Sequence, residues 1–348
     1  MASKRKVAIL GYYGYCNAGD EAFKAVFTRA FKDADIEFVR AIAEQQAGTR
    51  YVLGGGAVIN SFFFGSIKKP VPLHLIGCSL PHGPNDFEIL RRYPGTIESL
   101  YLRSRDDVEA ARKEGFEATF IPDIVFSLEP RGPAELAALV ARASVPPVDF
   151  GKRKKTIFVF LSDDYHIIYG EKMERFVEIE NLKTALAAAL DALCEKFDIV
   201  MPSLSVGHSA RDYVFAASVV RRMKHRTRVA IIEPYIDPET IIDTIAATDS
   251  LVISMKYHGL VFGLLNKRFV INIGSTRKNL NLMADAGLDG LTLRQNGLTE
   301  RMIIDAVEKH TTPRLTQAIA TVAEEWRAES RAKLAAIHAG FVGTKIRA

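Results

Sequence analysis

Short runs of apolar residues alternate, along the first third of the chain, with segments in which apolar residues recur every three or four positions. The runs predict buried strands, and the longer segments predict amphipathic helices. The second of these helices is followed by Gly115, where a left-handed cap is expected. A strand followed by a helix, repeated, indicates a parallel sheet. The predicted strands are 7–10, 51–53, 73–76 and 99–102, and the predicted helices are 20–31 and 105–114.

The alternation is interrupted between residues 129 and 155, where prolines bracket an alanine-rich piece and a basic cluster precedes the next strand. Such a break indicates a domain boundary. The sequence therefore predicts an α/β protein of two Rossmann-like domains, 1–140 and 150–348, the second with a long C-terminal helix. Beyond the break, the predicted strands are 156–161, 199–202, 229–232, 251–254 and 269–273, and the predicted helices are 179–197, 211–223, 238–247, 260–265, 278–286, 300–309 and 313–339.

Open parallel sheets bind their ligands at the carboxyl ends of the strands. We therefore expect the active site in strand-to-helix turns that face a cleft between the two domains. The first such turn, residues 11–21, holds Gly14, Gly19 and three tyrosines, together with Asn17 and Asp20. It matches neither a dinucleotide-binding fingerprint nor a Walker loop. A plain turn with Asp20 as N-cap is the simpler interpretation, but the density of polar groups favours ligand binding.

Two further turns of the first domain carry candidate residues. Gly54, Gly55 and Gly56 follow the second predicted strand, and their bare backbone N–H groups can cradle an anion or a sugar. Close packing against the first turn explains the triplet equally well. Arg105, after another strand, is either a fork for an anion or the partner of Asp106 on the rim.

The turn at residues 254–259 reads Ser-Met-Lys-Tyr-His-Gly and opens the helix predicted at 260–265. Lys256 and His258 stand two residues apart at the N-terminus of that helix, where the helix dipole adds to their positive charge. A lone histidine in such a context is more often a core residue. Its pairing with a lysine at a strand end favours a site for phosphate or carboxylate.

Composition excludes several classes of protein. The 348 residues are 48% hydrophobic and 25% charged, as in ordinary globular proteins. A net charge of +5 is too small to indicate nucleic-acid binding. The three cysteines form no CxxC pair, and no His/Asp pair has metal-ligand spacing. Without a long apolar stretch or an export signal, we expect a cytoplasmic protein with no transmembrane segment. We assign no residue to a metal, and metal dependence stays open.

The order of these motifs resembles that of polysaccharide pyruvyl transferases. The resemblance rests on the turn Gly-Tyr-Tyr-Gly-Tyr-Cys-Asn-Ala-Gly-Asp-Glu-Ala at 11–22, the triplet at 54–56, Arg105-Asp106 followed by Pro122-Asp123, and the turn at 254–260. It extends from about residue 7 to residue 288. It implies a fold similar to GT-B glycosyltransferases and the transfer of pyruvate from phosphoenolpyruvate to sugar hydroxyls as a ketal.

The resemblance also implies roles for individual residues, with no cofactor beyond the donor substrate. His258, followed by Asp20, is the candidate for proton transfer. The second domain takes the donor and the first takes a saccharide acceptor, which can be a lipid-linked sugar reached at a membrane surface. The implied donor-binding residues are Ser254, Lys256, His258, Gly259 and Lys278, and the implied acceptor-binding residues are Tyr13, Gly14, Asn17, Gly19, Asp20, Gly54, Gly55, Gly56 and Arg105.

Two positions depart from the family pattern. Lys256 stands where the family most often has arginine, which exchanges a bidentate fork for a point charge and should weaken the grip on a carboxylate. Ser162, Asp163 and Asp164 stand where many members place an arginine, and two carboxylates there would repel an anionic donor. The alternatives are therefore a GT-B-like glycosyltransferase that uses a nucleotide sugar, and a non-catalytic glycan-binding relative.

Overall fold

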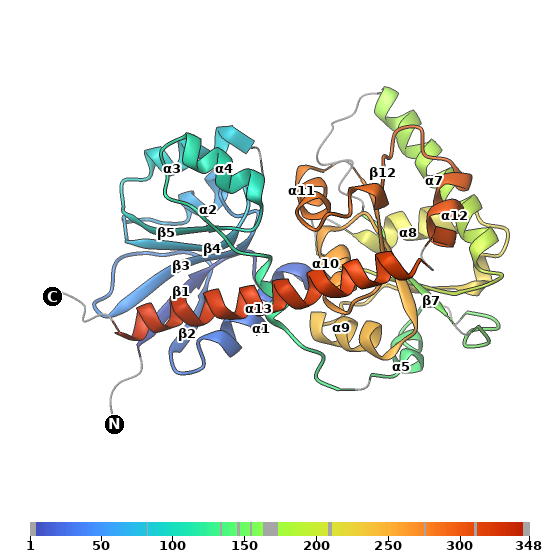
Figure 1. Ribbon diagram of the computed structural model, residues 1–348, viewed down its shortest axis with the longest axis horizontal. Coiled ribbons are helices and arrows are strands. Elements are labelled where there is room, and N and C mark those ends of the chain that lie inside the picture. The colour runs from blue at the N-terminus through green and yellow to red at the C-terminus, as the bar shows by residue number, and fades with distance from the viewer. Residues whose placement is uncertain are drawn as a thin grey trace. The chain divides into compact units, whose positions relative to one another are not determined.

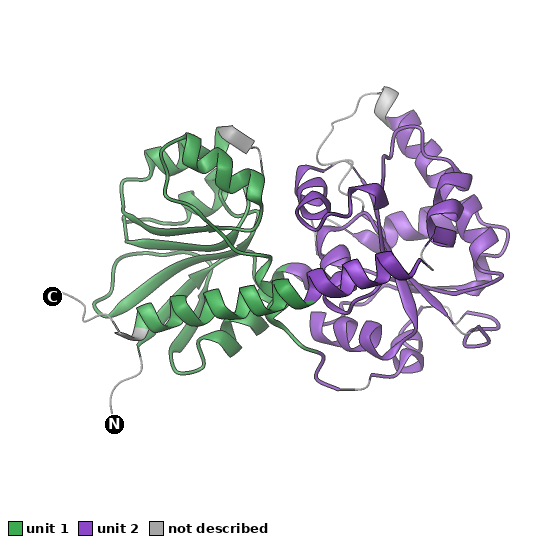
Figure 2. Cartoon of the chain, viewed as in Figure 1, with its two compact units in different colours: residues 1–15, 20–129, 324–348 green, residues 16–19, 130–323 purple. Residues whose placement is uncertain are grey.

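The computed structural model describes residues 5–81, 83–132, 134–144, 147–153, 155–162, 173–207, 211–274, 276–309 and 312–343 (Figure 1). The chain forms two compact units (Figure 2). Unit 1 comprises residues 1–15, 20–129 and 324–348, and unit 2 comprises residues 16–19 and 130–323. The short segment Cys16–Gly19 therefore belongs to unit 2, although both of its flanks belong to unit 1.

Unit 1 is built on a six-stranded sheet in the order β2-β1-β3-β4-β5-β6, and all of its pairings are parallel. Since β1 lies between β2 and β3, the chain leaves β1 and β3 in different directions at their carboxyl ends. This is the switch point at which open sheets bind ligands. The strands are β1 (Lys6–Leu10), β2 (Asp35–Val39), β3 (Thr49–Gly56), β4 (Leu73–Cys78), β5 (Ile97–Leu102) and β6 (Thr119–Phe120).

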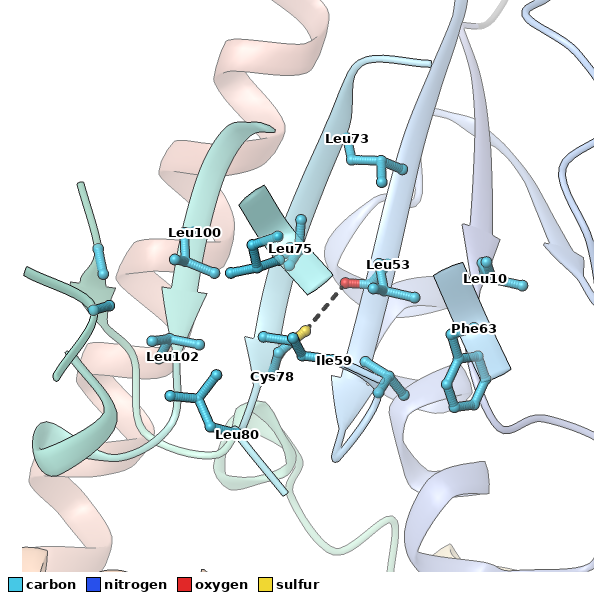
Figure 3. Close-up of a cluster of buried hydrophobic side chains, with 14 of the residues drawn as sticks. Leu10, Leu53, Ile59, Phe63, Leu73, Leu75, Cys78, Leu80, Leu100 and Leu102 are labelled. Carbon is cyan, nitrogen blue, oxygen red and sulfur yellow. Dashed lines mark hydrogen bonds between the residues drawn. The ribbon is translucent and has the colours of Figure 1, made fainter. Parts of the chain in front are cut away.

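Helices lie on both faces of this sheet (Figure 1). Ser104 caps α4 by accepting a hydrogen bond from the Asp107 N–H, and Gly115 follows the helix with φ +84°. Leucines of β3, β4 and β5 form the centre of a buried cluster, in which the Cys78 Sγ–H donates to the Leu53 carbonyl (Figure 3). The helices are α1 (Ala18–Ala30), α2 (Ser61–Gly65), α3 (Phe87–Arg92) and α4 (Arg105–Lys113).

Unit 2 repeats this architecture with the strand order β12-β11-β10-β7-β8-β9, again parallel throughout. β7 and β8 are buried at every position, which is why their sequences, after the first residue of each, read as apolar runs. The switch point of this sheet lies between β7 and β10. The strands are β7 (Thr156–Phe160), β8 (Asp198–Pro202), β9 (Val229–Ile232), β10 (Ser250–Ser254), β11 (Val270–Ile273) and β12 (Thr292–Leu293).

The helix that follows β10 is the most deeply buried of unit 2. Eight of the nine residues of α10 (Tyr257–Leu265) are buried, so its sequence is apolar on all sides. The preceding helix, α9 (Pro238–Ala247), begins at Pro238. Asp237 is its N-cap, and Asp237 Oδ1 accepts a hydrogen bond from the Thr240 N–H at 2.9 Å. The remaining helices are α5 (Leu136–Val140), α7 (Met173–Leu193), α8 (Asp212–Val220), α11 (Arg277–Asp285) and α12 (Glu300–Glu308).

The long C-terminal helix α13 (Pro313–Gly343) contributes to both units. From Glu324 onward it packs within unit 1, where the Trp326 ring meets Phe126 edge to face at 4.9 Å and Phe341 lies against His74. No helix in the described part of the chain is long and apolar enough to cross a membrane.

The predicted fold class is confirmed: both halves are parallel α/β sheets, and a long helix ends the chain. The strand predicted at 229–232 and the helix predicted at 238–247 coincide with β9 and α9. Strand β2 was not predicted. It is an edge strand with no fully buried residue, and therefore shows neither a buried run nor a strong alternation.

Candidate functional site

The carboxyl ends of β7 and β10 lie side by side at the switch point of unit 2. The register pairs Ser254 with Phe160, and the Met255 N–H donates to the Phe160 carbonyl at 2.8 Å. The turn from Ser254 to Gly259 therefore leaves the sheet at the edge where open α/β sheets bind ligands.

Ser254 fixes the shape of this turn. It is fully buried, its hydroxyl donates to the Lys256 carbonyl at 2.7 Å, and it accepts from the Lys256 N–H at 3.0 Å. A Cβ atom at position 259 would lie 2.3 Å from Ser254 Oγ and 2.7 Å from the Phe160 ring. Gly259 is thus required by close approach, and Ser254 is a structural member of the turn.

Lys256 is the N-cap of α10, and His258 lies in the first turn of that helix. The His258 ring is half-buried and packs edge to face on Tyr257 at 5.2 Å and obliquely on Phe262 at 6.1 Å. The first backbone N–H groups of a helix point out of its N-terminus together with the positive end of its dipole. The turn therefore places two basic side chains around a helix end that attracts anions.

The ammonium group of Lys256 pairs with a carboxylate from α8. Lys256 Nζ lies 3.1 Å from Asp212 Oδ1, and the two side chains are 11% and 3% exposed. The second carboxylate oxygen, Asp212 Oδ2, accepts from the Ser205 N–H at 2.8 Å. The positive charge of Lys256 is thus balanced within unit 2.

The segment Cys16–Gly19 is held against unit 2 by backbone hydrogen bonds. Asn17 and Ser205 form an antiparallel bridge, the Ala18 N–H donates to the Leu204 carbonyl at 2.7 Å, and the Val206 N–H donates to the Cys16 carbonyl at 3.1 Å. These bonds place Cys16–Gly19 of the first predicted turn beside Ser205, whose N–H also donates to Asp212.

Gly19 lies directly against the imidazole of His258. A Cβ atom at position 19 would lie 2.0 Å from His258 Nδ1 and 2.5 Å from its Cγ. Asn17 shapes the approach, because its Oδ1 accepts from the Gly19 N–H at 3.1 Å. The structure therefore brings together Asn17, Gly19, Lys256 and His258, four of the predicted site residues.

Two buried asparagines support the same turn from the opposite side. The Asn279 amide of α11 donates to the Met255 carbonyl and to Asn272 Oδ1, both at 3.1 Å. Asn272, at the end of β11, donates in turn to Thr292 at 3.4 Å. The amide side chains thereby link the turn after β10 to β11 and to the start of β12.

The remaining part of the first turn forms a second group, in unit 1. The Tyr13 hydroxyl donates to the Gly54 carbonyl at 2.5 Å, and the Gly14 N–H donates to Glu21. Burial, followed by the charge of Asp20, raises the pKa of Tyr13 well above its usual value. A Cβ atom at Gly56 would lie 3.1 Å from Asp20 Oδ1, which places this carboxylate beside the glycine triplet.

Close packing accounts for much of the triplet. Cβ atoms at Gly54 and Gly55 would lie 2.7 Å from the Phe27 ring and 2.3 Å from the Phe23 ring, both on α1. Gly55 and Gly56 also adopt positive φ angles of 72° and 87°. The triplet therefore lets α1 approach β3 closely.

The other predicted residues lie at the starts of two other helices, α4 and α11, and directly after β7. Arg105 begins α4 and stacks on the Phe120 ring at 4.2 Å, whereas Arg103 forms the buried ion pair with Asp123 at 2.8 Å. Lys278 is exposed in the first turn of α11. Ser162 is buried, and Asp163 and Asp164 lie outside the described residues.

Sequence reasoning missed Asp212, Ser205 and Asn279, which hold the turn in place. Asp212 follows Arg211 at the start of a predicted helix, where it reads as an ordinary first-turn carboxylate. An Asn in the first turn of α11 is likewise unremarkable by itself. Only the order of the strands brings these side chains to Lys256 and Met255.

Solved structures with the same architecture define the class of the fold. The chain is similar to a Listeria monocytogenes protein assigned as a UDP-N-acetylglucosamine 2-epimerase, with 11% identity, 99% and 98% of the two chains covered and a TM-score of 0.60. It is also similar to MnaA of S. aureus in complex with UDP (9%, 99% and 99%, 0.59) and to the glycotransferase of kitacinnamycin (11%, 98% and 100%, 0.52). The fold is that of GT-B glycosyltransferases and related epimerases.

The sequence itself identifies the family within this class. The profile of the polysaccharide pyruvyl transferase family matches residues 17–276, from the first turn through the strand that follows α10. The chain belongs to the polysaccharide pyruvyl transferase family and is a transferase. A search of curated proteins gave no match.

Proposed function

We propose that the protein transfers the pyruvyl unit of phosphoenolpyruvate to two hydroxyls of a saccharide, forming a cyclic ketal and releasing phosphate. The observation that carries the proposal is the placement of Lys256 and His258 around the N-terminus of α10, with Gly19 packed on the imidazole. A helix end with two basic groups suits a small ligand that carries both phosphate and carboxylate. Family membership supports the same donor.

The donor would bind through the backbone N–H groups at the start of α10, together with Lys256, His258 and Lys278. Ser254 contributes by holding the backbone of Lys256, and Gly259 contributes because a larger residue there would clash with Ser254 and Phe160. On the acceptor side we propose Tyr13, Asn17, Asp20 and Arg105, with Gly14, Gly19 and the triplet at 54–56 giving close backbone approach.

The reaction needs three proton transfers and one leaving group. Protonation of the methylene carbon of phosphoenolpyruvate turns it into a methyl group and makes C2 electrophilic, so that a sugar hydroxyl adds there and loses its proton. A second hydroxyl then replaces the phosphate at C2, and its proton leaves with the phosphate. We propose His258 as the acid for the methylene carbon and Asp20 as the base for the first hydroxyl.

Mixing the purified protein with phosphoenolpyruvate and simple galactosides tests the proposal. We expect phosphate release that depends on the sugar, and a product whose mass corresponds to a pyruvate ketal. His258→Ala should abolish phosphate release, whereas His225→Ala, which removes an exposed histidine of the same unit, should not. Binding of UDP with no response to phosphoenolpyruvate would instead favour a nucleotide-sugar glycosyltransferase. Binding of the galactoside alone would indicate a non-catalytic relative.

A further inference from the structure

The ion pair between Lys256 and Asp212 places a nearly buried carboxylate next to the proposed donor site. Asp212 is the first residue of α8, and its side chain is 3% exposed. Taking a carboxylate and an ammonium out of water is costly unless each is paired and hydrogen-bonded. A pair in this position therefore needs a compensating benefit, either for the fold or for the turn that carries Lys256.

The two carboxylate oxygens have different partners on different segments. Oδ1 receives the Lys256 ammonium at 3.1 Å, and Oδ2 receives the Ser205 N–H at 2.8 Å. The Asp212 N–H in turn donates to the Ser205 carbonyl at 3.0 Å. Asp212 thus connects Lys256 to the backbone of Ser205, the residue that bridges Asn17.

A continuous series of contacts therefore links Lys256 to His258. Lys256 is tied through Asp212 to Ser205, Ser205 is bridged to Asn17, and Asn17 holds the N–H of Gly19, which packs on His258. The two basic residues of the turn are therefore fixed against each other by contacts that lie outside the turn. A shift of Asp212 would disturb the ammonium and the Cys16–Gly19 segment at once.

We propose that Asp212 is a positioning residue of the donor site: it holds the Lys256 ammonium at the N-terminus of α10 and joins it to the Cys16–Gly19 segment. The inference rests on the proposed function, because it concerns how Lys256 meets phosphoenolpyruvate. It accounts for a lysine, rather than an arginine, at this position. A flexible ammonium gains a fixed position from Asp212, whereas the rigid fork of an arginine needs less help.

Asp212→Asn tests whether the carboxylate of Asp212 positions Lys256 or whether the side chain of Asp212 only fills space. An Asn side chain has the shape of Asp, but one of its two positions becomes an NH2 donor and faces either the Ser205 N–H or the Lys256 ammonium. It can therefore accept from one partner only. We expect the dissociation constant for phosphoenolpyruvate, measured by titration calorimetry on the full chain, to rise about tenfold, as for the loss of one charge-assisted hydrogen bond.

Asp243 supplies the matched control. This buried carboxylate of α9 also accepts from one backbone N–H, that of Arg131 at 2.8 Å, and from one cationic side chain, Arg131 Nε at 2.9 Å. Asp243→Asn should lower the thermal stability of unit 2 without changing the affinity for phosphoenolpyruvate. An equal loss of affinity in both variants would show that Asp212 acts only through stability, and would overturn the proposal.

A double variant keeps the test decisive if Asp212→Asn does not fold. Lys256→Met combined with Asp212→Asn removes both charges, so no uncompensated ion remains buried. If Asp212 acts through Lys256, this variant binds phosphoenolpyruvate as weakly as Lys256→Met alone, and a further loss would contradict the proposal. Failure of the wild-type protein to bind phosphoenolpyruvate would refute the proposed function itself, whereas unchanged binding by Asp212→Asn would refute only the role of Asp212.

Discussion

Because Gly19 has no side chain, the imidazole of His258 can lie directly against the backbone at this position. Because a Cβ atom there would approach Nδ1 to 2.0 Å, Gly19→Ala must displace the ring or the segment 16–19. We expect the affinity for phosphoenolpyruvate to fall about tenfold or more, since one well-placed polar contact contributes about that much. Calorimetric titration measures the change. Gly290→Ala is the control, because a Cβ atom at Gly290 meets nothing within 4 Å, and an unchanged affinity in Gly19→Ala would contradict the expectation.

Lys256 offers a second prediction at the scale of one residue. Lys256→Arg replaces an ammonium by a guanidinium, which offers two parallel N–H bonds in place of one point contact. We expect phosphoenolpyruvate to bind more tightly by about 1 kcal/mol, or several-fold. The same titration decides the matter. Weaker binding would mean that the position is fitted to a lysine held by Asp212, and that the longer side chain crowds the end of α10.

At the scale of elements, Asn279 ties α11 to the end of β10. Its amide serves two buried acceptors, the Met255 carbonyl and Asn272 Oδ1, so Asn279→Ala leaves both without this donor. We expect the free energy of unfolding to fall by about 1 to 3 kcal/mol, the cost of unsatisfied buried polar groups. Urea denaturation measures the loss. Leu280→Ala, at an exposed position of the same helix, should cost much less, and equal costs would argue against the role of the amide.

At the scale of the whole molecule, the C-terminal helix reaches into unit 1 and covers a histidine. His74 of β4 lies 4.6 Å from the Phe341 ring of α13, and its Nδ1 is 3.0 Å from Ser99 Oγ. Burial, followed by the charge of Arg50, lowers the pKa of His74 to about 4. The unfolded chain therefore binds a proton at this histidine at a higher pH than the folded chain does.

The lowered pKa gives stability a definite pH dependence. Between the ordinary pKa near 6.5 and about 4, protons favour the unfolded chain, so the contribution of His74 to stability falls with falling pH and levels off below pH 4. We expect a loss of about 2 to 3 kcal/mol over this window. Thermal melting from pH 7 to pH 4 should be less acid-sensitive in His74→Gln than in the wild type. Parallel curves would exclude His74 as the cause.

The sequence by itself determined the architecture and the chemistry of the turns. Continuous apolar runs such as 157–160 suit only strands buried on both faces, and such strands require helices between them. The composition of the turn at 254–259 marks a basic helix N-terminus, because the glycine, the lysine and the histidine are all local features. Strand β2 escaped prediction for the converse reason, since an edge strand buries too little to impose a pattern.

Only the tertiary structure decided which residues share a site. Asp212 lies 44 positions before Lys256, and the segment 16–19 lies far from both, so no local pattern relates them. The order of the strands around β7 brings their carboxyl ends to one edge, where these side chains meet. The glycine triplet shows the same limit: its sequence fits an anion cradle and a packing site equally, and only the structure shows that the Phe27 and Phe23 rings pack against Gly54 and Gly55. Periodicity records burial along one segment, whereas a site depends on distances between segments.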